Sequence, residues 1–473
     1  MQRRRIGLGG ALGVVSLACF AAFGSSCASS RCGEGATSAS AAAAAPTAPV
    51  KLTSASDAQP GARSTGKYRN VFAEHGKAQA DIDQKLKLAY DTYFSTSDAN
   101  RLYYEFGPDQ AYVKDIAHDD IRSEGQSYAM MITLQRNDQA KFNKLWKFAH
   151  EKMRIKSATH PNHRGFAWVV DPEGKICDEN SAPDGEEYFA MALYFAHHRW
   201  GSAASNEYDN YKHWADELLD VMKNRPSITG ARSRRVDAGG ADDGKPCTGS
   251  MTPTTITSLP LFDATRKQIL FDASTGSTFT DPSYHLPAFY ELFAAFGPPA
   301  DAEFWKGAAQ ASRELLVRAM NASTGLAPEY ANFDGSPHRV PWNENSGKFA
   351  YDAWRVGGNV GMDASWTGTP PAELAARADA LIAFFHRQGV STYQALWNLD
   401  GSGGSGSHSP GLVAMNAVAT LATSKAVATE AAAIVEDFWN TPLPTGKYRY
   451  YDGLLYTFAL LHLSGQYNIH QPR

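Results

Sequence analysis

The stretch IRSEGQSYAMMITLQ, residues 121–135, decides the fold of this chain. From Ser127 to Leu134 it is almost wholly apolar and has no polar face, which predicts a helix that is buried on all sides. Yet a carboxylate, Glu124, stands in the first turn of this helix. The other helices of the chain explain why an acid is placed where the interior begins.

Periodicity and length predict twelve helices along the chain. The odd-numbered helices are amphipathic, as in PAELAARADALIAFFHRQG, whereas the even-numbered helices are apolar nearly all round, as in YDGLLYTFALLHL. Such alternation predicts an all-α fold, an (α/α)6 barrel with helical hairpins in two concentric layers. Strand signals are few: FAWVV at 166–170 and QILF at 268–271. The twelve helices are expected near residues 75–95, 123–135, 138–153, 184–199, 206–223, 282–296, 300–320, 349–366, 370–388, 410–422, 425–438 and 449–464.

Polar or aromatic groups stand at the start of each even-numbered helix. If these helices are parallel inner staves, their N-termini meet at one mouth, and Glu124, Asp184 and Asp352 line one cavity. Helix capping is the alternative, because acids in a first turn stabilise a helix without any catalytic role. Capping explains Asp281, which Pro282 follows at the first helical position. It does not explain why three inner helices place acids beside aromatic residues.

Composition excludes several classes of function. The chain has 473 residues and a formal net charge of -4, so it has no basic excess and no nucleic-acid partner is expected. It has neither a GxGxxG motif after a strand nor a P-loop, which leaves phosphate-containing cofactors unsupported. His160 and His163 are interpreted as a surface loop, since no acidic or cysteine ligand is near them. We therefore expect no cofactor and no metal, and we expect a monomer.

The N-terminal segment has the features of an export signal. MQRRR is a basic region, and IGLGGALGVVSLACFAAFG is an apolar region, so residues 1–27 are predicted to be a signal peptide. GSSC at Cys27 loosely resembles a lipoprotein cleavage site, which leaves a lipid tether and plain secretion both open. Residues 28–65 are rich in Ala, Ser, Thr and Pro and are predicted to be a linker. Residues 66–473 are predicted to form one catalytic domain.

Two cysteines fall in the predicted domain, Cys177 and Cys247. An exported chain permits a disulfide bond. Both cysteines lie in loop-like sequence, so a bridge between loops and two free thiols remain alternatives.

Five motifs, taken together, resemble glycoside hydrolase family 8, and most closely its xylan-active branch. They are SEGQSYAMM, APDGEEYFAMAL, FTDPSYHLPAFYELFA, YDAWRVGGNVGMD and YRYYDGLLYTFALLHLSGQY, in the family's order between about residues 68 and 468. The resemblance implies an (α/α)6 barrel that hydrolyses xylan or xylo-oligosaccharides with inversion at the anomeric carbon. The chain departs from the family pattern at residues 226–280.

The resemblance also implies roles for single residues. Glu124 would be the general acid, Asp352 the general base, and Asp184 the group that holds the sugar in a distorted ring shape. Tyr284 would help to hold the attacking water, and Arg355 would lie close to the base. Trp168, Tyr351 and Tyr448 match positions that contact sugars.

The proposed chemistry places opposite demands on the two catalytic acids. Cleavage of an acetal with inversion needs one protonated carboxylic acid and one carboxylate. A helix N-terminus favours the ionised form, which suits Asp352 and opposes Glu124. Burial, or a like charge such as that of Asp184, must therefore raise the pKa of Glu124.

The mode of attack depends on the loop GSGGSGSHSPGLVAMNA, which contains His408. In the resembled family, enzymes that release xylose from the reducing end have a His-containing loop just before the fifth inner helix. We therefore favour a reducing-end exo-oligoxylanase, with His408 donating to the reducing-end hydroxyl, over an endo-xylanase.

A noncatalytic glycan-binding lipoprotein is an alternative from another class. A lyase acting on uronates is disfavoured, because it needs basic groups and the motifs at the mouth are acidic.

Overall fold

The computed structural model describes residues 51–54, 58–205, 207–236 and 246–472. The predicted signal peptide, Cys27 and the linker up to residue 50 lie outside the described residues.

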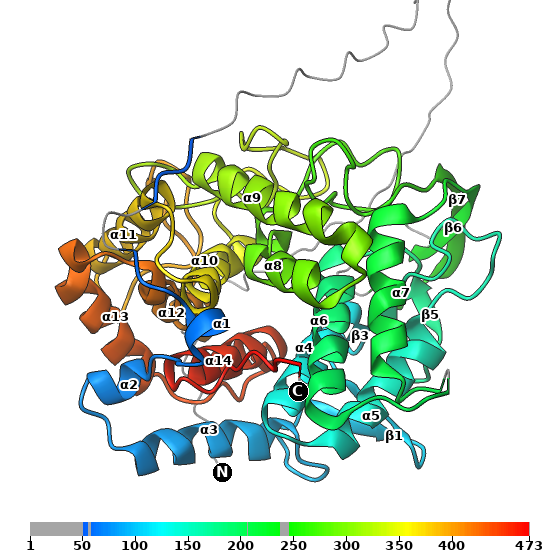
Figure 1. Ribbon diagram of the computed structural model, residues 1–473, viewed down its shortest axis with the longest axis horizontal. Coiled ribbons are helices and arrows are strands. Elements are labelled where there is room, and N and C mark those ends of the chain that lie inside the picture. Colours follow the sequence, from blue (N-terminus) through cyan, green and yellow to red (C-terminus); the bar gives the residue numbers. More distant parts are fainter. Residues whose placement is uncertain (1–50, 55–57, 206, 237–245, 473) are drawn as a thin grey trace, which may run out of the picture.

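In the described part of the chain, twelve long helices form two layers (Figure 1). The inner helices are α4 (Ser123–Gln135), α6 (Pro183–Trp200), α8 (Pro287–Phe296), α10 (Trp354–Thr367), α12 (Pro410–Ala419) and α14 (Arg449–Leu463). The outer helices are α3 (Gln79–Tyr93), α5 (Gln139–Phe148), α7 (Tyr211–Asn224), α9 (Ala302–Ala319), α11 (Ala372–Arg387) and α13 (Ala428–Asn440). Each inner helix contacts the next, α14 contacts α4 to close the ring, and an outer helix packs against each inner one. The predicted (α/α)6 barrel is confirmed, with every predicted long helix in its place.

Burial separates the inner layer from the outer layer. In α4 every residue is buried except Glu124, whereas the outer helix α13 buries only Ile434, Val435 and Phe438. Small residues let the inner helices approach closely. A Cβ atom added at Gly361 of α10 would lie 2.1 Å from the carbonyl oxygen of Val418 in α12. The small-residue runs of the even-numbered helices are therefore required by close packing of backbones.

The folded part of the chain begins before the predicted boundary at residue 66. Residues 62–65 form a short helix, α1 (Ala62–Thr65), which contacts α10, and Pro60 pairs with Gly368. The backbone N–H of Thr53 donates to the Glu373 carboxylate over 2.9 Å. The end of the predicted linker is thus packed against the barrel, and a second short helix, α2 (Val71–Glu74), follows.

Single turns of other helix types complete the helical part. They are the π-helical turn η1 (Ala149–Met153) and the 3₁₀ turns η2 (Pro282–Tyr284), η3 (Pro299–Asp301), η4 (Tyr351–Ala353), η5 (Thr420–Ala422) and η6 (Lys425–Val427). Two of these turns, η2 and η4, carry residues of the predicted site.

The strands lie at one side of the barrel. A hairpin joins β1 (Tyr103–Phe106) to β2 (Gln110–Val113). An antiparallel five-stranded sheet has the order β3 (Ile121–Arg122), β4 (Val169–Val170), β5 (Ile176–Asp178), β6 (Thr229–Val236) and β7 (Ser250–Thr257).

The strand predictions were only partly correct. Of the strand predicted at 166–170, only the last two residues are paired as β4. The strand predicted at 268–271 is wrong, because Ile269 makes only an isolated bridge to Phe262. Its apolar residues reflect burial in a loop. The long hairpin of β6 and β7 lies within residues 226–280, where the chain departs from the family pattern, and its polar sequence gave no strand signal.

Cys177 and Cys247 form a disulfide bond. It ties β5 to the chain just before β7, which settles the alternative that the sequence left open.

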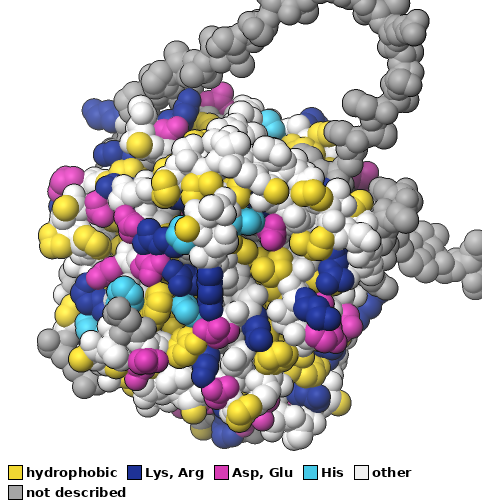
Figure 2. Space-filling model, turned by 90° about the vertical axis from the view of Figure 1, so that its right-hand side faces the viewer, with side chains coloured by type: hydrophobic (Ala, Val, Ile, Leu, Met, Phe, Trp, Pro, Cys, Tyr) yellow, Lys and Arg dark blue, Asp and Glu magenta, His cyan; other side chains and the backbone are white. Residues whose placement is uncertain are grey.

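Within the part of the chain that the structure describes, no helix has both the length and the apolar character needed to span a bilayer. On the face seen in Figure 2, Lys and Arg side chains lie among Asp and Glu side chains and form no continuous basic patch.

Candidate active site

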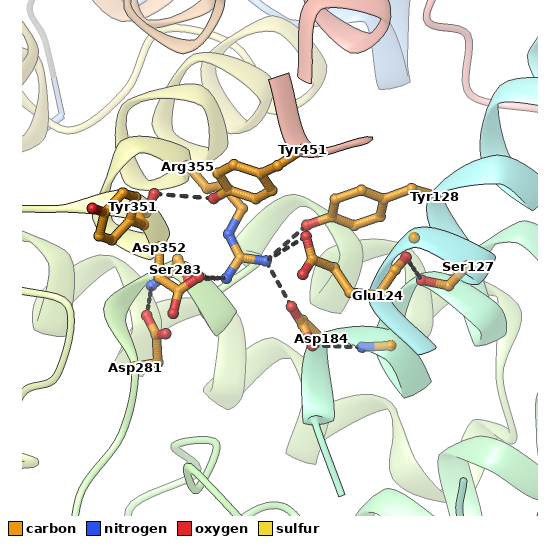
Figure 3. Close-up of polar contacts among 12 residues, drawn as sticks. Glu124, Ser127, Tyr128, Asp184, Asp281, Ser283, Tyr351, Asp352, Arg355 and Tyr451 are labelled. Carbon is orange, nitrogen blue, oxygen red and sulfur yellow. Dashed lines mark hydrogen bonds and ion pairs between the residues drawn. The ribbon is translucent and has the colours of Figure 1, made fainter. Parts of the chain in front are cut away.

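The three predicted acids come together at the N-terminal ends of inner helices. Glu124 and Asp184 lie in the first turns of α4 and α6, and Asp352 lies in η4, which leads directly into α10. Figure 3 shows their side chains pointing toward a common centre. The structure therefore brings the three acids together at one end of the barrel, as the sequence predicted.

Arg355 stands at this centre and is only 4% exposed. Its Nη1 donates to Asp184 Oδ2 over 2.6 Å and to the hydroxyl of Tyr128 over 2.9 Å. Its Nη2 donates to Asp352 Oδ1 over 3.0 Å and to Ser283 Oγ over 2.8 Å (Figure 3). One guanidinium thus links α4, α6, η2 and η4, and it fixes two of the acids relative to each other.

Glu124 is the acid that Arg355 does not hold by a hydrogen bond. Its Oε1 lies 3.8 Å from Arg355 Nη1 and is buried without a hydrogen-bond partner in the protein. Burial raises the pKa of Glu124 to about 8; the charge of Arg355 opposes this, and the charges of Asp184 and Asp352 add to it. The expectation that burial and Asp184 raise this pKa is confirmed. Glu124 is therefore protonated at neutral pH, and one of its oxygens makes no hydrogen bond within the protein.

Two further buried acids, Asp184 and Asp281, lie near Glu124 and Arg355. Burial raises the pKa of Asp184, and the adjacent Arg355 opposes the rise. Asp281 caps η2 by accepting the backbone N–H of Ser283 over 2.7 Å, as the capping interpretation predicted. Burial and the charge of Asp352 raise the pKa of Asp281 well above its usual value.

Aromatic side chains surround the acids. The ring of Tyr284 is buried, and its centroid lies 5.9 Å from the Arg355 guanidinium. The half-buried Tyr351 precedes Asp352, and its carbonyl oxygen accepts the hydroxyl of Tyr451 over 3.0 Å. The predicted positions of Tyr284 and Tyr351 beside the acids agree with the structure.

Trp168 lies next to the start of α4. Its carbonyl oxygen accepts the backbone N–H of Ser123 over 2.9 Å, and the Arg122 guanidinium lies 5.4 Å from the centroid of its ring. Because Ser123 precedes Glu124, the half-buried indole ring stands near the predicted acid.

His408 and Tyr448 take no part in the hydrogen bonds around Arg355. The His408 ring nitrogens lie 3.0 Å from the carbonyl oxygen of Tyr393 and 3.2 Å from Asp437 Oδ2. Both nitrogens are thus occupied within the protein, and the expected donation to a sugar hydroxyl would require one of these contacts to break. Tyr448 precedes α14 and is 49% exposed, with the Lys447 ammonium 4.7 Å from the centroid of its ring.

The sequence analysis did not identify three residues whose polar groups contribute to the site. They are Tyr128, Ser283 and Tyr451. A signal existed for Tyr128, which lies four residues after Glu124 and so on the same face of α4. Ser283 lies in η2 directly before Tyr284, and Tyr451 lies in the first turn of α14, so both stand in motifs that already supplied predicted site residues. Among the described residues, no three or more His, Cys, Asp or Glu side chains are grouped to hold a metal ion.

The family model of Glycosyl hydrolases family 8 matches residues 112–225 and 269–465. The chain belongs to this family. The unmatched interval, 226–268, contains the β6–β7 hairpin, so the departure predicted at 226–280 coincides with the part that the family model does not cover. The protein is a glycoside hydrolase.

Curated relatives in family 8 are similar over nearly their whole length. A reducing-end xylose-releasing exo-oligoxylanase of Paenibacillus barcinonensis is 37% identical over 87% of this chain and 98% of its own. A second enzyme of that name, from Halalkalibacterium halodurans, is also 37% identical, over 87% of this chain and 97% of its own. The solved structure of a family 8 xylanase from Teredinibacter turnerae, a catalytic mutant in complex with xylohexaose, is 39% identical. It matches with a TM-score of 0.78 over 87% of this chain and 100% of that one.

Proposed function

We propose that this glycoside hydrolase cleaves β-1,4-xylosidic bonds with inversion and releases xylose from the reducing end of xylo-oligosaccharides. The observation that carries the proposal is the pair formed by Glu124 and Asp352. Two carboxyls from different inner helices face one arginine, and only one of them is hydrogen-bonded to it. The names of the two curated relatives support the substrate and the end that is attacked.

In the proposed reaction Glu124 is the general acid. Its raised pKa keeps it protonated, and its side chain, which is 14% exposed, can give the proton to the departing sugar oxygen. Asp352, whose Oδ1 accepts a hydrogen bond from the Arg355 guanidinium, takes a proton from the attacking water. Water attacks the face of the sugar opposite to the leaving group, which inverts the configuration.

Two further groups act on the substrate in this proposal. Asp184 is held in place by Arg355. It accepts a hydrogen bond from a hydroxyl of the sugar at the cleaved bond and holds the ring of that sugar in a distorted shape. Tyr284 helps Asp352 to hold the water. Trp168, Tyr351 and Tyr448 offer aromatic surfaces to neighbouring sugars.

Xylohexaose incubated with the purified protein tests the class of function. A hydrolase gives shorter saturated sugars, whereas a lyase gives products with unsaturated ends. Unchanged xylohexaose would support the noncatalytic glycan-binding protein.

Endo-xylanase action is the second candidate, and the contacts of His408 favour it. Both ring nitrogens of His408 have protein partners. The N–H group expected to bind the reducing-end hydroxyl of the substrate is therefore already used within the protein. The Teredinibacter turnerae relative is moreover described as a xylanase in complex with xylohexaose.

Reduced xylotetraose, compared with ordinary xylotetraose, separates exo from endo action. An enzyme that recognises the reducing-end ring should cleave the reduced sugar poorly and release xylose from the ordinary one. Equal cleavage, with a rapid fall in the viscosity of polymeric xylan, would establish endo action. His408→Ala should weaken end selectivity more than cleavage if the exo proposal is correct.

We also propose that the protein is exported and held at a membrane by a lipid on Cys27. The basic and apolar regions of residues 1–27 and the sequence GSSC support this. Metabolic labelling with palmitate in a bacterial host should mark the wild-type chain and leave Cys27→Ser unlabelled. Release of an unlabelled wild-type chain into the medium would indicate plain secretion.

A further inference from the structure

A buried carboxyl outside the proposed mechanism, Glu187, lies in α6 three residues after Asp184. It is 0% exposed, and its Oε1 is hydrogen-bonded to the hydroxyl of Tyr290 in α8. Its Oε2 is buried and makes no hydrogen bond within the protein. The hydrogen bonds of Arg355 go to other groups of the site. The Glu187 carboxyl therefore lies in the interior without a hydrogen bond from this cation.

The hydroxyl of Tyr290 lies between two oxygen atoms. One is Oε1 of Glu187, and the other is the backbone carbonyl oxygen of Tyr284, at 3.0 Å. A phenol has a single hydrogen to donate, whereas a carbonyl oxygen and a carboxylate can only accept. With an ionised Glu187, one of the two contacts would therefore lack a hydrogen. With a protonated Glu187, the acid donates to Tyr290 and Tyr290 donates to Tyr284, so both contacts are hydrogen bonds.

The surroundings of Glu187 agree with this count of hydrogens. Burial raises the pKa of Glu187 well above its usual value. The hydrogen bond to Tyr290 and the charge of Arg355 oppose the rise, whereas the charges of Asp184 and Glu186 add to it. A neutral Glu187 can thus lie close to the acids of the site without adding a further negative charge.

The hydrogen bonds that start at Glu187 end at the turn η2. Ser283 of this turn is held at its side chain by Arg355, over 2.8 Å, and at its carbonyl oxygen by the side-chain amide of Asn359, over 2.7 Å. The next carbonyl oxygen, that of Tyr284, accepts from Tyr290. Tyr290 therefore fixes the end of the turn that carries Tyr284, whose ring lies beside the Arg355 guanidinium.

We propose that Glu187 and Tyr290 are positioning residues for Tyr284: the proton of Glu187 directs the Tyr290 hydroxyl to the Tyr284 carbonyl oxygen, and this bond fixes the turn that presents Tyr284 to the attacking water. This inference rests on the proposed role of Tyr284 in holding that water.

Three variants test the inference on the oligosaccharide that the wild-type enzyme cleaves. Tyr290→Phe removes the shared hydroxyl and should lower kcat by about 10- to 100-fold, with KM changed less than about twofold, because misplacement of a group at the reacting centre mainly affects turnover. Glu187→Leu removes the donor and should have the same effect. Glu187→Gln keeps a donor of similar shape and should retain kcat within about threefold of wild type. A wild-type kcat in Tyr290→Phe would overturn the inference.

Tyr456→Phe is the matched control. Tyr456 is a buried tyrosine of the inner helix α14, and its hydroxyl also donates to a backbone carbonyl oxygen over 3.0 Å, that of Thr441. This variant loses the same kind of hydrogen bond away from η2 and should keep the wild-type kcat. A loss of kcat equal to that of Tyr290→Phe would mean that any such bond in the barrel matters, and would also overturn the inference.

Coupling to Tyr284 separates positioning from a merely structural role. Tyr284→Phe removes the hydroxyl that is proposed to hold the water. If Tyr290 acts through Tyr284, the addition of Tyr290→Phe to Tyr284→Phe should lower kcat by less than about a further twofold. Losses that multiply in the double variant would show that Tyr290 acts independently of Tyr284, against the inference.

Infrared difference spectroscopy measures the state of the Glu187 proton directly. The spectrum of wild type minus that of Glu187→Gln at neutral pH should contain the carbonyl band of a protonated carboxyl. Carboxylate bands in its place would mean that Glu187 is ionised and would contradict the inference.

Failure of the proposed function would be recognised separately. If Asp352→Asn keeps wild-type activity, the base assignment fails, whatever the Tyr290 and Glu187 variants do. If Glu187→Leu does not fold, judged by circular dichroism, the kinetics of Tyr290→Phe and the infrared spectrum of Glu187→Gln still decide the inference.

Discussion

At the scale of single residues, Glu124 is subject to opposing effects. Its place at a helix N-terminus and the nearby Arg355 favour the ionised form, whereas burial and two neighbouring carboxylates favour the protonated form. Burial is the largest of these influences, and the pKa of Glu124 rises to about 8.

The pH profile should report this pKa. A general acid is active only while protonated, so kcat/KM should fall as pH rises through about 8. Asp184→Asn removes one of the like charges, which should move the alkaline limb to lower pH besides lowering the rate. An alkaline limb that stays in place in this variant would contradict the assigned cause.

Substitution of the two catalytic carboxyls should abolish most turnover. Glu124→Gln and Asp352→Asn should each lower kcat by roughly 10²–10⁴-fold, the usual contribution of a positioned acid or base, while the circular dichroism spectrum stays unchanged. Glu303→Gln, at an outer-helix side chain that is 86% exposed, is the control and should match wild type. If either variant retains more than about a tenth of the wild-type activity, the catalytic role assigned to the substituted residue is wrong.

At the scale of elements, the contact between α10 and α12 is close enough to require glycine. Gly361→Ala should destabilise the protein by about 1–3 kcal/mol, because the added methyl group meets the backbone of Val418 and not a movable side chain. Gly446→Ala is the matched control, since nothing lies within 4 Å of its added methyl group. Urea unfolding of both variants measures the difference, and equal stability would show that the two helices can separate at little cost.

The disulfide between Cys177 and Cys247 ties the β6–β7 hairpin to β5. Its removal in Cys247→Ser should lower the free energy of unfolding by about 2–4 kcal/mol, as expected for a native bridge. Thermal unfolding in the presence and absence of reductant measures the effect. Addition of reductant should lower the Tm of wild type and leave that of the variant unchanged; an unchanged wild-type Tm would count against the prediction.

At the scale of the whole molecule, the barrel brings acid and base to one mouth from inner helices that are far apart in sequence. Hydrolysis by such a pair should invert the anomeric centre. Proton NMR of the first products from a β-linked xylo-oligosaccharide should therefore show the α-anomer before mutarotation. An initial β-anomer would require a covalent nucleophile in place of the proposed water.

The sequence by itself determined the number and order of the long helices and the layer to which each belongs. The reason is that helical periodicity and the width of the apolar face are local properties, readable within one helix. It also placed Glu124, Asp184 and Asp352 at the starts of inner helices, and from that placement their meeting at one mouth followed.

Tertiary structure alone decided what surrounds these acids. Arg355 donates hydrogen bonds to groups of η4, α4, α6 and η2, and no local pattern joins Ser283 or Tyr128 to it. The β6–β7 hairpin forms from polar residues whose pairing depends on partners across the sheet, and the occupied nitrogens of His408 depend on α13. The pKa of Glu124 likewise depends on burial and on charges from other helices, because desolvation arises only when the barrel closes around the carboxyl.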